Sequence, residues 1–85
     1  MQVLTEPAKE YAHEIVGKMS RSELQIALEN IGVAVYDDED IGDLMDSYVD
    51  SVEAKDIEFS FDMHTAKAAG HHAYMMWLDI DDIWE

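Results

Sequence analysis

The sequence lacks cysteine and contains few basic residues. Its 85 residues include no cysteine, one proline, four glycines and only five lysine or arginine side chains. Without cysteine the chain forms neither disulfides nor thiolate metal sites, and we expect it in a reducing cytoplasm. No apolar run approaches the ~20 residues that cross a bilayer, and no basic and apolar leader opens the chain. We therefore expect neither a membrane segment nor a signal peptide.

Acidic side chains dominate the charge. Twenty aspartates and glutamates against five bases give a formal net charge of −15 at pH 7. Such a charge repels nucleic acid phosphates and anionic lipids, so we expect no direct binding to nucleic acid or to membranes. The hydrophobic fraction of 48% is too high for a disordered acidic chain. Length and composition together predict one small folded domain over residues 1–85.

Apolar residues at helical spacing predict a mainly α fold with three to four helices. The first helical pattern follows Thr5, and the second follows Ser20, which begins a capping box with Glu23. The third pattern follows a cap at Asp37 or Asp38 and has the most regular apolar stripe of the chain. Its start is rich in carboxylates, which the positive end of a helix dipole stabilises.

The second half of the chain combines several local patterns. Residues 57–61 alternate apolar and polar side chains, which predicts one short β element and makes an α+β fold the alternative. A further helix is predicted over residues 65–78, with an interruption at Gly70. The pattern of residues 74–85 fits a helix, a strand or a tail.

Five acidic residues recur along the third predicted helix, on the side opposite its apolar stripe. The row consists of Glu39, Asp43, Asp46, Asp50 and Glu53. At about 100° and 1.5 Å per residue, these residues fall within about 40° of one line and span roughly 21 Å. One carboxylate about every 5 Å is near the spacing of phosphates along one nucleic acid strand. A face that serves only solvation would interleave lysine, and this helix contains none.

A second acidic patch is predicted close to the C-terminus. It consists of Asp79, Asp81, Asp82 and Glu85. Trp84 lies among these acids, and a tryptophan there either docks on the core or anchors a partner or a second copy of the chain. A homodimer is therefore one expected assembly. We count Trp84, together with both acidic groups, among the candidate partner-binding residues.

Metal and catalytic motifs are incomplete. The acidic segment 37–42 begins like a calcium-binding EF-hand loop, but Ile41 and Tyr48 stand at its fifth and twelfth positions, where carboxylates are needed. Ser60 and His64 would alternate onto one face of a strand, but no glycine-rich nucleophile turn accompanies them. The histidines match no recognised ligand spacing. We expect no metal, no cofactor and no enzymatic activity.

The composition and the ordered acidic face resemble those of the DNA-mimic proteins of phages and mobile elements, which inhibit restriction or CRISPR enzymes. The resemblance covers mainly residues 37–85, which hold fifteen acids and two bases, and includes no shared motif. It implies a non-enzymatic inhibitor that presents carboxylates to a basic nucleic-acid-binding protein, such as a phage-defence nuclease complex, in the host cytoplasm. The alternative is a small acidic helical adaptor that binds through an apolar C-terminal surface. That surface would be formed by Tyr74, Met75, Trp77 and Trp84.

Overall fold

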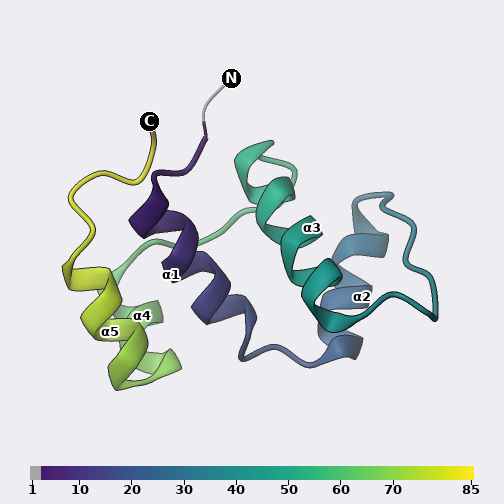
Figure 1. Ribbon diagram of the computed structural model, residues 1–85, viewed down its shortest axis with the longest axis horizontal. Coiled ribbons are helices and arrows are strands. Elements are labelled where there is room, and N and C mark those ends of the chain that lie inside the picture. Colours follow the sequence, from purple (N-terminus) through teal and green to yellow (C-terminus); the bar gives the residue numbers. More distant parts are fainter. Residues whose placement is uncertain (1–2) are drawn as a thin grey trace.

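The fold consists of helices joined by irregular segments (Figure 1). The computed structural model describes residues 3–85, and five helices occur within them. In chain order they are α1 (Glu6–Val16), α2 (Arg21–Asn30), α3 (Ile41–Glu53), α4 (Met63–Ala69) and α5 (His71–Leu78). No strand forms within residues 3–85. The prediction of a mainly α fold is confirmed, with five helices where three to four were expected.

The additional helix arises at Gly70. The stretch predicted as one interrupted helix is instead two separate helices, α4 and α5, joined at this glycine. Gly70 has φ of 125° and ψ of 177°, a backbone conformation that residues with a Cβ rarely adopt. The chain therefore changes direction there, and α4 and α5 pack against each other as a pair.

Residues 57–61 do not form the predicted β element, and the α+β alternative is also wrong. The alternation itself is present, because Ile57, Phe59 and Phe61 are half-buried while Glu58 and Ser60 are exposed. A strand also needs a neighbouring strand to pair with, and none lies beside this segment within the described chain. The segment therefore passes irregularly from α3 to α4 with its apolar side chains turned inward.

Capping side chains determine where α2 and α3 begin. Ser20 and Glu23 form the predicted capping box: the backbone N–H of Glu23 donates to the Ser20 hydroxyl over 3.2 Å, and the backbone N–H of Ser20 donates to the Glu23 carboxylate over 3.1 Å. The predicted cap of α3 at Asp37 or Asp38 is wrong. Asp40 caps this helix instead, and its carboxylate accepts a backbone N–H of the first turn over 2.9 Å.

Asp62 caps α4 with a carboxylate that accepts two hydrogen bonds. The Ser60 hydroxyl donates to one oxygen, and the backbone N–H of Thr65 donates to the other over 2.7 Å. These hydrogen bonds lower the pKa of Asp62 to about 2, with the Ser60 hydroxyl as the largest cause. Ser60 thus donates to the acid that caps α4 and not to His64, the base that a nucleophilic serine would need.

Acid titration should reveal the Asp62 cap. The folded pKa of about 2 lies below the ordinary value of 3.8, so the stabilisation is complete above about pH 4 and is lost as the pH falls toward 2. Asp62→Asn keeps a side-chain acceptor for the helix but cannot titrate, so it should lower stability at neutral pH and reduce the loss between pH 4 and 2. Thermal unfolding followed by circular dichroism measures both effects. Identical pH profiles for the two proteins would contradict the assigned pKa.

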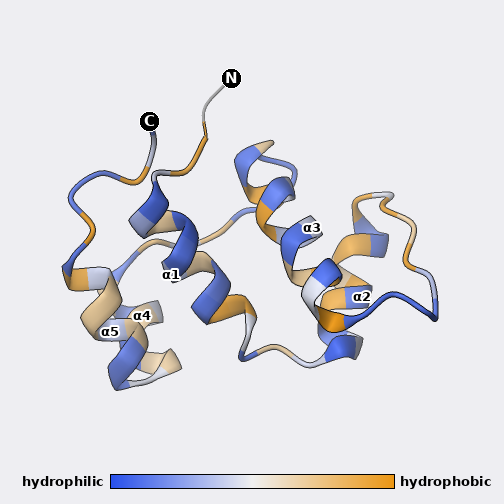
Figure 2. Cartoon of the chain, viewed as in Figure 1, coloured by the Kyte–Doolittle hydropathy of each residue, from blue (hydrophilic) through white to orange (hydrophobic). Residues whose placement is uncertain are grey.

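Helix α1 lies between two helical pairs (Figure 1). On one side α1 packs against α3, which pairs with α2, and on the other side it packs against α5, which pairs with α4. The molecule measures 36 × 29 × 17 Å along its principal axes and is therefore flat. Figure 2 shows hydrophilic and hydrophobic positions alternating along α1 and α3, as expected for helices with one buried side.

Two adjoining apolar clusters hold the helices together. The larger cluster joins α1, α2 and α3, and its fully buried side chains include Val16, Leu24, Leu28, Leu44 and Val49. In the smaller cluster, α4 and α5 pack on α1 through side chains that include Tyr11, Ala66 and Ala73. Phe59, Phe61 and Ile80 pack against both clusters. The irregular segment from α3 to α4 therefore connects the two halves of the core.

Tyr11 is fully buried at the centre of the smaller cluster. Its ring lies 6.3 Å from that of Phe59 and 5.9 Å from that of Phe61, measured between ring centroids. Its hydroxyl has no hydrogen-bond partner among the described residues. Burial, and secondarily the negative charge of Asp62, raises the pKa of Tyr11. The hydroxyl therefore loses its hydration on folding without a replacement in the core.

Removing that hydroxyl should stabilise the protein. Tyr11→Phe keeps the ring and deletes only the unpaired polar atom, so we expect a gain of about 1 kcal/mol in the free energy of unfolding. The matched control is Tyr36→Phe, at a residue that is 64% exposed, where little change is expected. Urea unfolding of both variants measures the difference. A Tyr11→Phe variant less stable than the parent would show that the hydroxyl is hydrogen-bonded in solution.

The two described ends of the chain lie side by side (Figure 1). The backbone N–H of Thr5 donates to the carbonyl of Ile83 over 3.0 Å, and that of Glu85 donates to the carbonyl of Val3 over 2.9 Å. The Thr5 hydroxyl adds a bond of 2.6 Å to the carbonyl of Asp82. Of the three conformations that the sequence allows for residues 74–85, the chain adopts two, a helix as far as Leu78 followed by a docked tail.

Candidate functional site

Three of the predicted acidic residues form an exposed group on α3. Asp43, Asp46 and Asp50 project to solvent, while Leu44 and Val49 of the same helix are fully buried. At about 100° per residue the three carboxylates fall within about 30° of one line. We call this group the α3 acidic face.

Glu39 does not belong to that face. It lies in the loop before α3, because the helix begins at Ile41. Its carboxylate accepts the backbone N–H of Tyr36 over 3.2 Å and so closes a turn around Asp37 and Asp38. The prediction that all five acids share one helix face is therefore wrong for Glu39, the first residue of the predicted row. Asp37 and Asp38 are exposed and carry the negative surface into the loop.

Glu53 lies at the other end of the predicted row and is largely buried. Its side chain is only 17% exposed. Its carboxylate accepts the backbone N–H of Leu4 over 3.3 Å and lies 3.7 Å from Nζ of Lys9. Glu53 thus fixes the chain ahead of α1 onto the end of α3. This role depends on residues about fifty positions away, and no local pattern could have indicated it.

Asp46 combines exposure with one contact to α1. Its carboxylate lies 3.7 Å from Nε2 of His13, and its side chain is 71% exposed. His13 and Lys9 are one turn apart on α1, and they meet Asp46 and Glu53 on the antiparallel α3. The α3 acidic face therefore meets α1 along one edge and remains open to solvent along the other.

Each of the five basic side chains contacts another part of the chain. Two form ion pairs, one binds backbone carbonyls, and two lie over aromatic rings. Nζ of Lys9 lies 3.7 Å from the Glu53 carboxylate, and Nζ of Lys18 lies 3.4 Å from that of Glu14. Arg21 donates to the backbone carbonyls of Tyr36, Asp37 and Glu39. The ammonium group of Lys55 lies 5.7 Å from the ring centroid of Trp84, and that of Lys67 lies 5.4 Å from the ring centroid of Tyr74. Each positive group thus has a partner within the chain, although Lys18, Lys55 and Lys67 are themselves exposed, whereas most carboxylates face solvent without such a partner among residues 3–85.

Arg21 also fixes the shape of the acidic loop. Its guanidinium reaches from the start of α2 to three backbone carbonyls of the loop before α3. It donates to the carbonyl of Tyr36 over 3.1 Å, to that of Asp37 over 3.4 Å, and also to that of Glu39. A planar guanidinium suits this task because its several N–H donors point in fixed directions. Asp37 and Asp38 are therefore held in a defined position beside the α3 acidic face.

The second predicted patch lies at the opposite side of the molecule, on the docked tail (Figure 1). Asp79, Asp81, Asp82 and Glu85 are all exposed. Trp84 is half-buried, and its ring packs 6.4 Å from that of Phe61 between centroids. Of the outcomes that the sequence left open for Trp84, the structure shows docking on the core. Its place among partner-binding residues stays a prediction.

His72 contacts a carboxylate of α1 and does not belong to a metal-binding cluster of the described residues. Within residues 3–85 no group of three or more histidine, cysteine, aspartate or glutamate side chains could hold a metal ion. Nδ1 of His72 instead lies 3.2 Å from the Glu14 carboxylate, and this hydrogen bond is the main reason why the pKa of Glu14 is lowered. None of the helices in the described part is long and apolar enough to cross a membrane.

Two hollows near the tail were not predicted. One of about 330 Å³ lies between Phe61 and the end of α5, and one of about 280 Å³ lies between Phe61 and Trp84. In the sequence, the first hollow is indicated only by three apolar residues among the acids near the C-terminus, Leu78, Ile80 and Ile83. Their spacing is irregular, so only the fold shows that they gather around one space.

A scan against protein-family models and searches of curated proteins and of solved structures found no match to this chain. Function is therefore inferred from the chemistry of the surface itself.

Proposed function

We propose that this protein is a non-enzymatic inhibitor that presents carboxylates, in place of phosphates, to a basic protein that binds nucleic acid. The observation that carries the proposal is the separation of charge. All five bases contact internal partners, whereas the three carboxylates of the α3 acidic face project to solvent. A basic cleft approaching this face meets negative charge without interleaved positive charge.

The shape of the acidic surface supports the same function. From Asp43 to Asp50 the helix rises about 10 Å, so the α3 acidic face corresponds to a short stretch of nucleic acid strand. Asp37 and Asp38, which lie in the loop held by Arg21, extend the surface beyond the helix. A helix and a clamped loop present these charges with little loss of conformational freedom on binding, which favours affinity.

The net charge of −15 would also speed association with a cationic partner. Opposite fields steer encounter, and the effect weakens as salt screens charges beyond a Debye length of about 8 Å at physiological ionic strength. The proposal therefore requires strong salt dependence. An adaptor that held its partner by apolar contact alone would bind with little change over the same salt range.

Capture from a host lysate followed by two elutions tests the proposal. We expect the captured protein to be released by raising the salt and, separately, by adding duplex DNA, because phosphates and the acidic surface compete for one basic cleft. The triple variant Asp43→Lys, Asp46→Lys, Asp50→Lys serves as the matched bait that should capture nothing. If the captured partner resists both elutions, or binds the variant equally well, the proposal that this protein mimics nucleic acid is wrong.

A further inference from the structure

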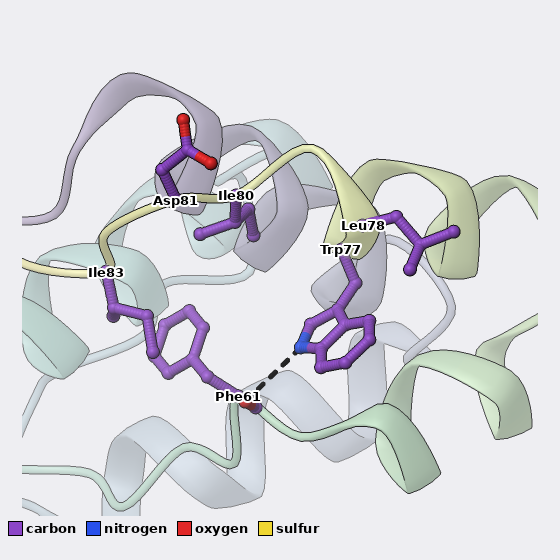
Figure 3. A pocket seen from close by; sticks show the side chains of 6 residues that line it. All are labelled: Phe61, Trp77, Leu78, Ile80, Asp81 and Ile83. Atoms are coloured by element: carbon purple, nitrogen blue, oxygen red, sulfur yellow. Dashed lines mark hydrogen bonds between the residues drawn. The ribbon is translucent and has the colours of Figure 1, made fainter.

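The larger hollow is bounded by aromatic and aliphatic side chains with one carboxylate (Figure 3). Its volume of about 330 Å³ is at the small end of the range for binding pockets, which begins at about 300 Å³. It is lined by Phe61, Trp77, Leu78, Ile80, Asp81 and Ile83. In Figure 3 the rings of Phe61 and Trp77 face the hollow, while the carboxylate of Asp81 points away from both rings at the outer rim.

Contacts within the protein hold the walls of this hollow in place. The indole N–H of Trp77 donates to the carbonyl of Phe61 over 3.4 Å, and its ring stacks on Tyr74 with centroids 6.2 Å apart. Ile83 is positioned because its own carbonyl accepts the backbone N–H of Thr5. The hollow therefore exists before any partner arrives, and filling it requires little rearrangement.

The apolar surface continues outward from the hollow along α5. Leu78 at its edge is 50% exposed, and Met75, one turn earlier on the same helix face, is 47% exposed. Two large apolar side chains beside an apolar hollow form a continuous surface that water solvates poorly. Ile26 on α2 is even more exposed, at 59%, but lines neither hollow.

Exposed carboxylates stand next to the lining residues along the chain. Asp81 lines the hollow, Asp79 and Asp82 flank it along the tail, and Asp62 directly follows Phe61 in the chain. The two bases of this half of the molecule are engaged elsewhere, Lys55 over Trp84 and Lys67 over Tyr74. An occupant with apolar and positive groups side by side would match the hollow and its rim.

We propose that the hollow between Phe61 and Trp77 binds a segment of a cationic protein, in which one bulky apolar side chain is flanked by lysine or arginine. The apolar side chain enters the hollow, and the cationic groups meet Asp79, Asp81 and Asp82. A second copy of this chain is a poor occupant, because each copy carries a charge of −15. The site is separate from the α3 acidic face and does not depend on the function proposed for it.

A set of three short peptides tests this site. The probe is acetyl-Lys-Lys-Phe-Lys-Lys-amide, and the matched peptides replace its Phe with Ala or its four Lys with Glu. We expect the probe to shift the indole N–H signal of Trp77 saturably in NMR spectra. The alanine peptide should bind about fivefold more weakly or worse, because it lacks the ring that fills the hollow. The glutamate peptide should cause no shift, because its charges repel the acidic rim.

Two matched variants locate the binding. Leu78→Ser should weaken binding of the probe about fivefold. Ile26→Ser, the corresponding change at a residue that is at least as exposed, should leave binding within about twofold. The triple lysine variant of the α3 acidic face should still bind the probe at about 150 mM salt, where distant charges are screened. Equal binding of the alanine peptide, or an unchanged Leu78→Ser variant, would overturn the proposal. So would a dimer that Leu78→Ser dissociates in sedimentation experiments, because the occupant would then be a second copy.

Discussion

Changing Asp43, Asp46 and Asp50 to lysine is expected to leave the protein folded and to weaken binding of a basic partner by more than about 100-fold. The three side chains project from the side of α3 opposite its buried residues, and lysine is a good helix former. Like charges would then face the partner's basic cleft, at a cost of several kcal/mol. Circular dichroism checks the fold, and calorimetry with the captured partner measures the affinity.

A second triple variant separates local from overall charge. Glu10→Lys, Glu29→Lys and Asp56→Lys alter exposed residues away from the α3 acidic face. Each reversal adds two charges, so both triple variants change the net charge from −15 to −9. We expect the second variant to lower the association rate and to retain most of the affinity. If both variants lose affinity equally, total charge and not this face determines binding.

Truncation of one buried side chain should strongly lower the stability of the fold without any change of charge. Leu44 follows Asp43 on α3 and is fully buried in the cluster that joins α1, α2 and α3. Leu44→Ala should cost about 2–5 kcal/mol, which is a large part of the stability of so small a protein. The control Ile41→Ala lies on the same helix but is 41% exposed, so its cost should stay below about 1 kcal/mol. Urea unfolding measures both. Similar losses would show that Leu44 is not a core residue in solution.

Features that depend on neighbouring residues were predictable from the sequence. The capping box of Ser20 and Glu23 closes within three residues, and it forms as expected. The stripe that buries Leu44 and Val49 follows from helical spacing alone. The interruption at Gly70 was also expected. Whether the helix bends there or divides into two helices depends on the backbone conformation of Gly70, which the sequence does not show.

Features that depend on distant residues were not predictable. The alternation at residues 57–61 reports which side chains are buried, but a β element also requires a partner strand that the fold does not supply. Helical spacing placed Glu53 on the polar side of α3, yet the arrival of Leu4 and Lys9 converts it into a structural contact. The acidic row therefore ends before Glu53, and it also lacks Glu39 because α3 begins only at Ile41. The identity of a partner stays a prediction, because neither spacing nor composition encodes the surface of another molecule.

The pairing of Leu4 with Trp84 has a practical consequence for protein engineering. Because the two described ends meet at one edge, a short flexible linker could join them, and new ends could be opened in an exposed loop. The same adjacency means that labels fused at either end would crowd the docked tail and the hollow beside it. A fluorescent donor and acceptor placed at the two ends would report release of the tail as a loss of energy transfer.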